Sequence, residues 1–255
     1  MNPEGTDVTG HMTTMLEHAE PAALPPTSRR VQAPAGDTRT VRGAALVAGA
    51  ALMLMAGLAG FGNLVVMAAP ATSGDAAETA AVASLYLAVL LDVLVAWALM
   101  RVFSPVDEAL SRLAAWFRLA YAGVFMVAVG QLPGIPALLS TSGYATAFTP
   151  EQLRGQALLK VDTFLDVWFA GLILFGIHLA LTGYLAYRSG FVPRAIAVLL
   201  VVAGAGYVLD SVVRIFIEEP AFAVSNVTFL GELLLALWLL FRGRRFSLVG
   251  GRHER

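Results

Sequence analysis

Four ionisable side chains lie in the middle of otherwise apolar stretches of the sequence. They are Asp92, Arg118, His178 and Glu232, and each belongs to a different stretch. An ionisable group at the centre of a bilayer costs about 2.5–3.5 kcal/mol, so each one needs a partner, water or a neutral form. With a helical rise of about 1.5 Å per residue, the four groups fall at similar depths near the midplane. We therefore expect them to form one intramembrane polar cluster.

This cluster permits two interpretations. Arg118 contacts an anion or a substrate in an internal cavity, or it forms a structural ion pair with Asp92 or Glu232. Two carboxyl groups exceed what one arginine needs, so one of them is protonated, paired with His178 or in contact with water. A carboxyl group in such a position is what a proton-coupled site would use. His178 by itself is typical of a core histidine bonded to a neighbouring helix, and no metal site is expected.

A second group of charges lies nearer to one end of the apolar stretches. Asp210 and Arg214 are one helical turn apart with the acid on the N-terminal side, which is the better orientation for a pair on one helix. Asp166 falls at a comparable depth in another stretch. The simplest expectation is an outer ion pair that lets these residues enter the bundle.

The composition is typical of a membrane protein. Of 255 residues, 58% are hydrophobic and 14% are charged, and the mean hydropathy is +0.72; soluble domains have about 25% charged residues. The net charge of −1 gives no indication of nucleic acid as a partner. The sequence has no cysteine, which excludes thiol catalysis, thiolate metal sites and disulfides. It also has no Walker loop, nucleophile elbow or His-Glu-x-x-His motif, so no cofactor is expected and nothing requires catalysis.

Six apolar stretches are long enough to cross a bilayer as helices. They are 44–69, 81–103, 110–132, 163–187, 195–217 and 223–241. The expected fold class is all-α, a bundle of six transmembrane helices within residues 41–243. Residues 1–40 lack an apolar period and are predicted to be a disordered cytoplasmic tail. Residues 244–255 are predicted to be a short basic cytoplasmic tail.

The joints between these spans carry helix-start signals. Ser104 is followed by a proline and, at the third position, by Asp107, which predicts a helix capped by Ser104. A similar pattern at Thr149 predicts a short amphipathic helix at the interface. Whether that helix continues into span 163–187 is left open. Segment 133–148 is broken by prolines and glycines and is expected to be a surface loop rather than a re-entrant segment.

The positions of the basic residues predict the orientation of the bundle, because cytoplasmic loops are enriched in Lys and Arg. The residues assigned to the cytoplasmic side are Arg29, Arg30, Arg39, Arg42, Arg101, Arg112, Arg188, Arg194, Arg242, Arg244, Arg245, Arg252 and Arg255. Both termini are therefore expected to be cytoplasmic. The excess of arginine over lysine, with much alanine and glycine, is typical of bacteria. We expect a multi-pass protein of the bacterial cell membrane with the lipid bilayer as its partner, and the oligomeric state is left open.

Three blocks of sequence resemble a known family. The stretch from Phe175 to Arg194, FGIHLALTGYLAYRSGFVPR, is similar to the signature of a bacterial membrane family known as domain of unknown function 4386. The segment from Ala203 to Tyr207 with Asp210, and the segment from Gly231 to Trp238, look like later blocks of that family. The resemblance implies the membrane fold and topology but no activity.

The resemblance covers about Val41 to Gly243. In that family an arginine in the third span tends to be followed three residues later by glutamate, whereas Arg118 is followed at that distance by Tyr121. Arg118 must therefore find its acidic partner on another helix.

Two function classes are compatible with these residues. The first is a non-catalytic protein that binds or transports a small molecule or an ion through the midplane cluster. The second is a structural or interaction protein whose buried charges only hold the helices together. An intramembrane enzyme has less support. A cavity that connects the cluster to water favours the first class, and a dry, tightly paired cluster favours the second.

Overall fold

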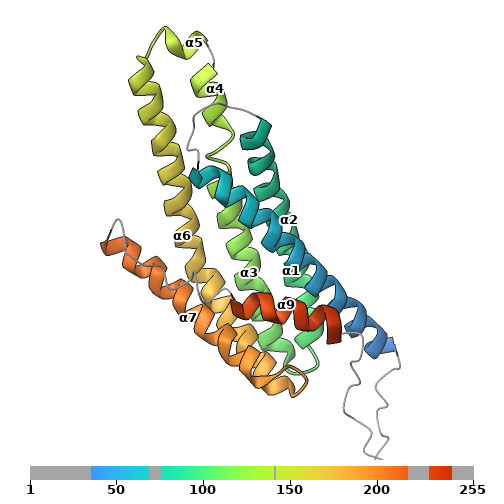
Figure 1. Cartoon of the computed structure of the whole chain (residues 1–255). Coiled ribbons are helices and arrows are strands. Elements are labelled where there is room, and N and C mark those ends of the chain that lie inside the picture. The colour runs from blue at the N-terminus through green and yellow to red at the C-terminus, as the bar shows by residue number, and fades with distance from the viewer. Residues whose placement is uncertain (1–35, 69–75, 141, 218–229, 243–255) are drawn as a thin grey trace, which may run out of the picture. The chain divides into compact units, whose positions relative to one another are not determined.

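The structure, a computed structural model, describes residues 36–68, 76–140, 142–217 and 230–242. Every regular element in these ranges is a helix (Figure 1). The helices are α1 (Gly36–Ala68), α2 (Ala76–Phe103), α3 (Glu108–Val129), α4 (Gly134–Ser140), α5 (Ser142–Ala145), α6 (Pro150–Ser189), α7 (Arg194–Phe216) and α9 (Leu230–Arg242). Most of the predicted tail 1–40 and all of the predicted tail 244–255 lie outside the described residues.

Five helices are long and apolar enough to cross a membrane, namely α1, α2, α3, α6 and α7. These helices indicate a multi-pass membrane protein and confirm the all-α fold class. The described helix α9 covers the second part of the predicted sixth span, and residues 223–229 of that span lie outside the described residues. The count of six spans therefore stays a prediction.

The long helices pack as neighbouring pairs. Helix α1 lies along α2, α6 lies along α7, and α3 packs between α2 and α6 (Figure 1). Helix α9 contacts both α1 and α7. Helices suit a bilayer because they bond their backbone groups internally, where no water is present to do so. In this arrangement α3 lies between the pair α1–α2 and the pair α6–α7 and contacts α2 and α6 directly.

Small residues allow the closest of these helix contacts. A side chain at Gly204 of α7 would collide with the backbone carbonyl oxygen of Gly176 in α6. Where α1 meets α9, a Cβ atom on Gly49 would lie 2.8 Å from the backbone nitrogen of Leu240. Because lipid tails are as apolar as the side chains, close backbone packing is a main source of helix association in a bilayer. These glycines bring α7 and α9 close enough to complete the bundle.

The start of α3 differs from the prediction. Its N-cap is Asp107, whose carboxylate accepts a hydrogen bond from the backbone nitrogen of Leu110 at 3.0 Å. The predicted cap, Ser104, lies in the turn after α2, and its hydroxyl donates to the carbonyl oxygen of Arg101 at 3.3 Å. The prediction was wrong because the turn needs the residues between Phe103 and Asp107 to reverse the chain direction before a new helix begins.

Helix α6 starts as predicted and runs without a break. The Thr149 hydroxyl accepts from the backbone nitrogen of Gln152 at 3.3 Å, and the Gln152 side chain accepts from the backbone nitrogen of Thr149 at 2.9 Å. This reciprocal arrangement is a capping box. The helix then continues for 40 residues to Ser189, about 60 Å. The interfacial segment and the fourth span are therefore one helix.

Two other boundaries also differ from the sequence prediction. Helix α1 begins at Gly36, eight residues before the predicted span 44–69, because a helix can continue into the polar headgroup region. Segment 133–148 contains the short helices α4 and α5 instead of an irregular loop. Ile135 and Leu138 of α4 are buried, and α4 packs against α6. Apolar anchors therefore fold this segment onto one end of the bundle, which we call the α4 end.

Candidate functional site

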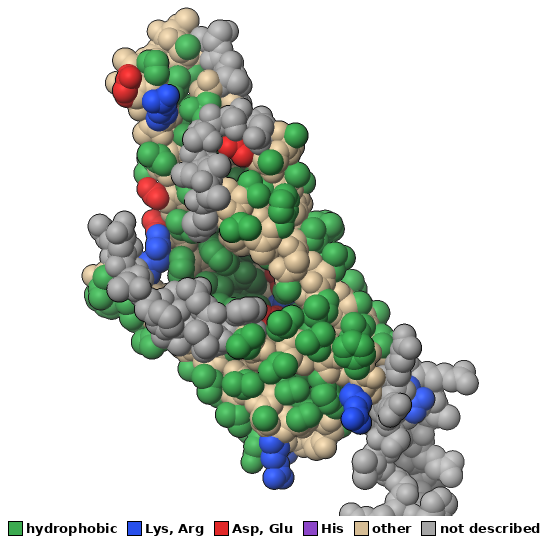
Figure 2. Space-filling view, in the orientation of Figure 1, with side chains coloured by type: hydrophobic (Ala, Val, Ile, Leu, Met, Phe, Trp, Pro, Cys, Tyr) green, Lys and Arg blue, Asp and Glu red, His purple; other side chains and the backbone are tan. Residues whose placement is uncertain are grey.

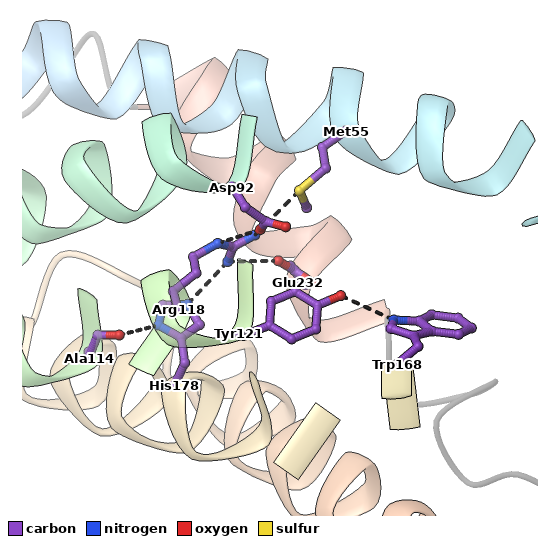
Figure 3. A network of polar contacts seen from close by, with 8 residues as sticks. All are labelled: Met55, Asp92, Ala114, Arg118, Tyr121, Trp168, His178 and Glu232. Atoms are coloured by element: carbon purple, nitrogen blue, oxygen red, sulfur yellow. Dashed lines mark hydrogen bonds and ion pairs between the residues drawn. The ribbon is translucent and has the colours of Figure 1, made fainter. Parts of the chain in front are cut away.

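Arg118 lies at the centre of the bundle. Its side chain comes from α3 and is completely buried, with 0% of its surface exposed. Around it the structure brings together side chains from four other helices, namely Asp92 of α2, His178 of α6, Glu232 of α9 and Met55 of α1 (Figure 3). The four residues expected to form a polar cluster are thus in mutual contact through one guanidinium group.

All five N–H groups of that guanidinium have a partner. Nε donates to Oδ1 of Asp92 at 2.9 Å, and Nη2 lies 2.7 Å from the same oxygen. Nη1 donates to Oε1 of Glu232 at 3.2 Å and contacts Nε2 of His178 at 3.1 Å. Nη2 also donates to Sδ of Met55 at 3.5 Å. Because arginine has five N–H donors and no acceptor, its hydrogen-bonding capacity is filled.

The hydrogen bonds of His178 assign its tautomer. Arg118 can only donate, so Nε2 of His178 must be the acceptor in their contact. Nδ1 lies 2.8 Å from the backbone carbonyl oxygen of Ala114, so it carries the hydrogen and donates it. The imidazole in this network is neutral. It ties α6 to α3 and orients the guanidinium without adding a charge to the cluster.

The two carboxyl groups differ in their exposure. The Asp92 side chain is 3% exposed and accepts two N–H groups of Arg118. The Glu232 side chain is 15% exposed and accepts one, at 3.2 Å. Figure 2 shows a hollow with hydrophobic walls above α9, between α6 and the paired helices α1 and α2, with acidic and basic side chains visible at its edge. Of the four charged or titratable side chains in the cluster, Glu232 is the most accessible.

Aromatic rings cover another side of the cluster. The guanidinium carbon of Arg118 lies 5.2 Å from the centroid of the Phe175 ring, which is a cation–π contact. The ring of Tyr121 is 4.7 Å from that of Phe175, and its hydroxyl accepts a hydrogen bond from Nε1 of Trp168 at 3.2 Å. Tyr121 stands where the family resemblance predicts a glutamate. The position contributes ring packing here, and the acids come from α2 and α9.

The outer charges link two helices. Nη2 of Arg214 on α7 lies 3.3 Å from Oδ1 of Asp166 on α6, and the guanidinium carbon lies 4.7 Å from the centroid of the Phe169 ring. Asp210 is buried one turn earlier on α7. The predicted contact between Asp210 and Arg214 within one helix stays a prediction, whereas the contact between Arg214 and Asp166 gives the outer pair a role in joining α6 to α7.

Sequence reasoning missed the uncharged partners of Arg118. Met55 and Phe175 look like any other apolar residue of a span, and the carbonyl of Ala114 has no signature in a sequence. The charged partners could be found because charges are rare at membrane depth. In the parts of the chain that the structure describes, no group of three or more His, Asp or Glu side chains is arranged to hold a metal ion.

A family model described as domain of unknown function 4386 matches residues 43–243. The chain belongs to this family. An uncharacterized protein from Archaeoglobus fulgidus is 33% identical over 168 residues, which are 66% of this chain and 86% of the relative. No solved structure matches the chain. The resemblance seen in the sequence is confirmed, and the family region contains the whole polar cluster around Arg118.

Proposed function

We propose that this member of the family is an ion-binding or small-molecule-binding membrane protein in which Glu232 receives a proton or a small cation. The observation that supports this proposal is that two carboxylates, Asp92 and Glu232, share one arginine, Arg118. Arg118 and Asp92 together are neutral and buried, and His178 is neutral. Glu232 therefore contributes a negative charge that this buried pair does not neutralise. A cation or a proton at Glu232 would neutralise the cluster and lower the cost of holding it within the membrane.

Access supports the same proposal. The Glu232 side chain is 15% exposed, whereas the side chains of Asp92 and Arg118 are almost completely buried, so Glu232 is the carboxylate that a proton or an ion would meet first. The hydrophobic hollow in Figure 2, with acidic and basic side chains at its edge, suits a site in which a few charged groups give specificity. We propose transport across the bilayer as the use of such a site, because a charge exchanged at membrane depth is what a proton-linked carrier needs.

A structural role is the second candidate, and one observation favours it. Every N–H group of Arg118 is satisfied, and partners from four helices surround it, as expected of a strut that fixes the bundle. The two proposals differ over Glu232. A strut requires Glu232 to stay bound to Arg118, whereas a binding site requires it to exchange protons or ions with the solvent.

Infrared difference spectroscopy of the full-length protein in lipid nanodiscs distinguishes the binding role of Glu232 from the structural role. The carboxylate band that is lost in Glu232→Gln should respond within seconds to a change of pH or to added Na⁺. The matched control is Glu108→Gln, since Glu108 is 70% exposed at the start of α3. A Glu232 band that stays constant from acid to alkaline pH and with Na⁺ would leave only the structural role.

Transport is tested in proteoliposomes that enclose a pH-sensitive dye. With a potassium gradient and valinomycin to set the membrane potential, wild-type protein and Glu108→Gln should acidify the lumen. Glu232→Gln should do so at least about tenfold more slowly, the effect of losing about 1.4 kcal/mol of stabilisation. Equal rates for the two variants would contradict a transport role for Glu232.

We also propose that the protein sits in a bacterial cell membrane with both termini in the cytoplasm. The support is the gathering of arginine residues at alternate ends of the helices, as at Arg101 in the last turn of α2 and Arg112 near the start of α3. Because the sequence has no cysteine, a single cysteine placed at Glu108 or at Gln152 is the only thiol in its variant. In intact cells a membrane-impermeant maleimide should label the second and spare the first, and the opposite result would invert the topology.

A further inference from the structure

A second cavity lies at the α4 end, away from the Arg118 cluster. It has a volume of about 310 Å³ and is lined by the last part of α1, the first turns of α2, the junction of α3 with α4, and α6. Glu78 lies fourteen residues before Asp92 on α2, which is about 21 Å along the helix. The cavity is therefore separate from the site of the proposed function, and its size lies at the lower end for small-molecule sites.

The walls of this cavity are apolar with one charge. Val66, Val82, Leu132, Ile135 and Val161 contribute aliphatic surface from four parts of the chain. Glu78 is the charged residue of the lining, and its Oε1 atom is shielded from solvent. An apolar cavity with a single carboxylate at its wall matches a ligand with an apolar body and one cationic end.

The ammonium group of Lys160 lies beside the same cavity. Nζ of Lys160 on α6 lies 3.4 Å from the position that a Cβ atom on Gly134 would occupy. The neighbours of Gly134, Pro133 and Ile135, both line the cavity. A carboxylate on α2 and an ammonium on α6 therefore flank the junction between α3 and α4. This pairing is complementary to a headgroup that carries an ammonium and a phosphate.

We propose that this cavity binds an amphiphile with an alkyl chain and a primary ammonium group, with the chain against the aliphatic walls and the ammonium on Glu78. Phosphatidylethanolamine is the zwitterionic membrane phospholipid with this chemistry, and a free alkylamine is the other source. Lys160 distinguishes the phospholipid from the alkylamine. Its ammonium group would contact the phosphate of the lipid, whereas an alkylamine has no anionic group for it to bind. Phosphatidylcholine has the same chain and phosphate but no N–H donor, so it is the matched control ligand.

Native mass spectrometry of the full-length protein tests the proposal. The protein is released from mixed micelles that contain equal amounts of dioleoyl phosphatidylethanolamine and dioleoyl phosphatidylcholine. Wild-type protein should retain the ethanolamine lipid at least about tenfold better, as expected for hydrogen bonds to a charged group. Glu78→Gln should bring the ratio to about one, while Glu108→Gln, at the start of α3, should keep it. Equal retention of both lipids by wild-type protein, or an unchanged ratio in Glu78→Gln, would overturn the proposal.

Filling the cavity tests its location independently. Val82→Phe should abolish retention of the lipid, whereas Val93→Phe, at a 48% exposed position of α2, should not. Retention by Val82→Phe at the wild-type level would place the ligand elsewhere. Dodecylamine then identifies the source of the ammonium. If Lys160→Gln weakens the binding of the lipid, the natural ligand is the phospholipid. If Lys160→Gln has no effect and dodecylamine displaces the lipid, the natural ligand is the free amine.

Discussion

Replacing Asp92 by asparagine should destabilise the protein far more than replacing Glu232 by glutamine. Asp92 accepts two N–H groups of Arg118, at 2.9 Å and 2.7 Å, in a buried setting. Removal of one partner from a buried ion pair costs about 3–5 kcal/mol, because a charge is left without compensation. Glu232 remains 3.2 Å from Nη1 and limits the loss. We expect a cost of about 3 kcal/mol for Asp92→Asn.

The corresponding cost for Glu232→Gln is about 1 kcal/mol. Its side chain is partly exposed, it makes one contact with Arg118, and the guanidinium keeps Asp92 as its counter-ion. In the double variant Arg118 is buried without any carboxylate in this cluster. The loss in that variant should therefore exceed the sum of the two single losses.

Thermal unfolding of the full-length protein in detergent, followed by tryptophan fluorescence, measures these differences. At about 2–4 °C per kcal/mol for a domain of this size, Asp92→Asn should lower the Tm by about 6–12 °C and Glu232→Gln by about 2–4 °C. Asp162→Asn is the matched control, since Asp162 is exposed on α6, and it should leave the Tm unchanged. Equal losses for Asp92→Asn and Glu232→Gln, or strict additivity in the double variant, would refute this assignment of roles.

Three further predictions concern helix contacts and the histidine. Gly204→Ala should reduce the yield of folded protein in size-exclusion chromatography, because the added methyl group meets the backbone of α6. Gly123→Ala is the control and should behave as wild type, since the space around Gly123 is open. Equal yields of the two variants would contradict the close packing. Nitrogen-15 NMR should show His178 protonated at Nδ1 and not at Nε2, and the opposite tautomer would contradict the network. Arg214→Gln should cost less than about 1 kcal/mol in unfolding, because its partner Asp166 is 69% exposed, and a larger loss would show that the pair is shielded.

The depth of charged residues in the sequence was enough to predict the centre of the site. Arg118 and the two acids lie on separate spans at matching depth, and the cost of isolated charges in a bilayer requires them to meet. The sequence could not assign the two acids their different roles. Asp92 and Glu232 look alike in apolar stretches, and the difference in their exposure depends on how the helices pack, which the sequence does not report.

The ends of the helices were predicted unevenly. Thr149 was identified as a cap because its partner Gln152 lies at the required spacing, and the capping box is local. Ser104 had a similar local pattern, yet Asp107 caps α3 because the connection from α2 uses the residues between them. A pattern of four residues cannot report the geometry of the preceding helix, so the observed cap of α3 lies three residues after the predicted one.

The length of α6 has a mechanical consequence. Its 40 residues extend about 60 Å, whereas a bilayer with its headgroups is about 40–45 Å thick. A straight rod of this length either tilts strongly or extends into the aqueous phase, with Leu158 and Leu159 exposed near its start. The helix is unbroken from Pro150 to Ser189, so the segment that packs against α4 and the His178 that contacts Arg118 belong to one continuous element. The position of the α4 end and the orientation of the Arg118 guanidinium are therefore tied to the same helix.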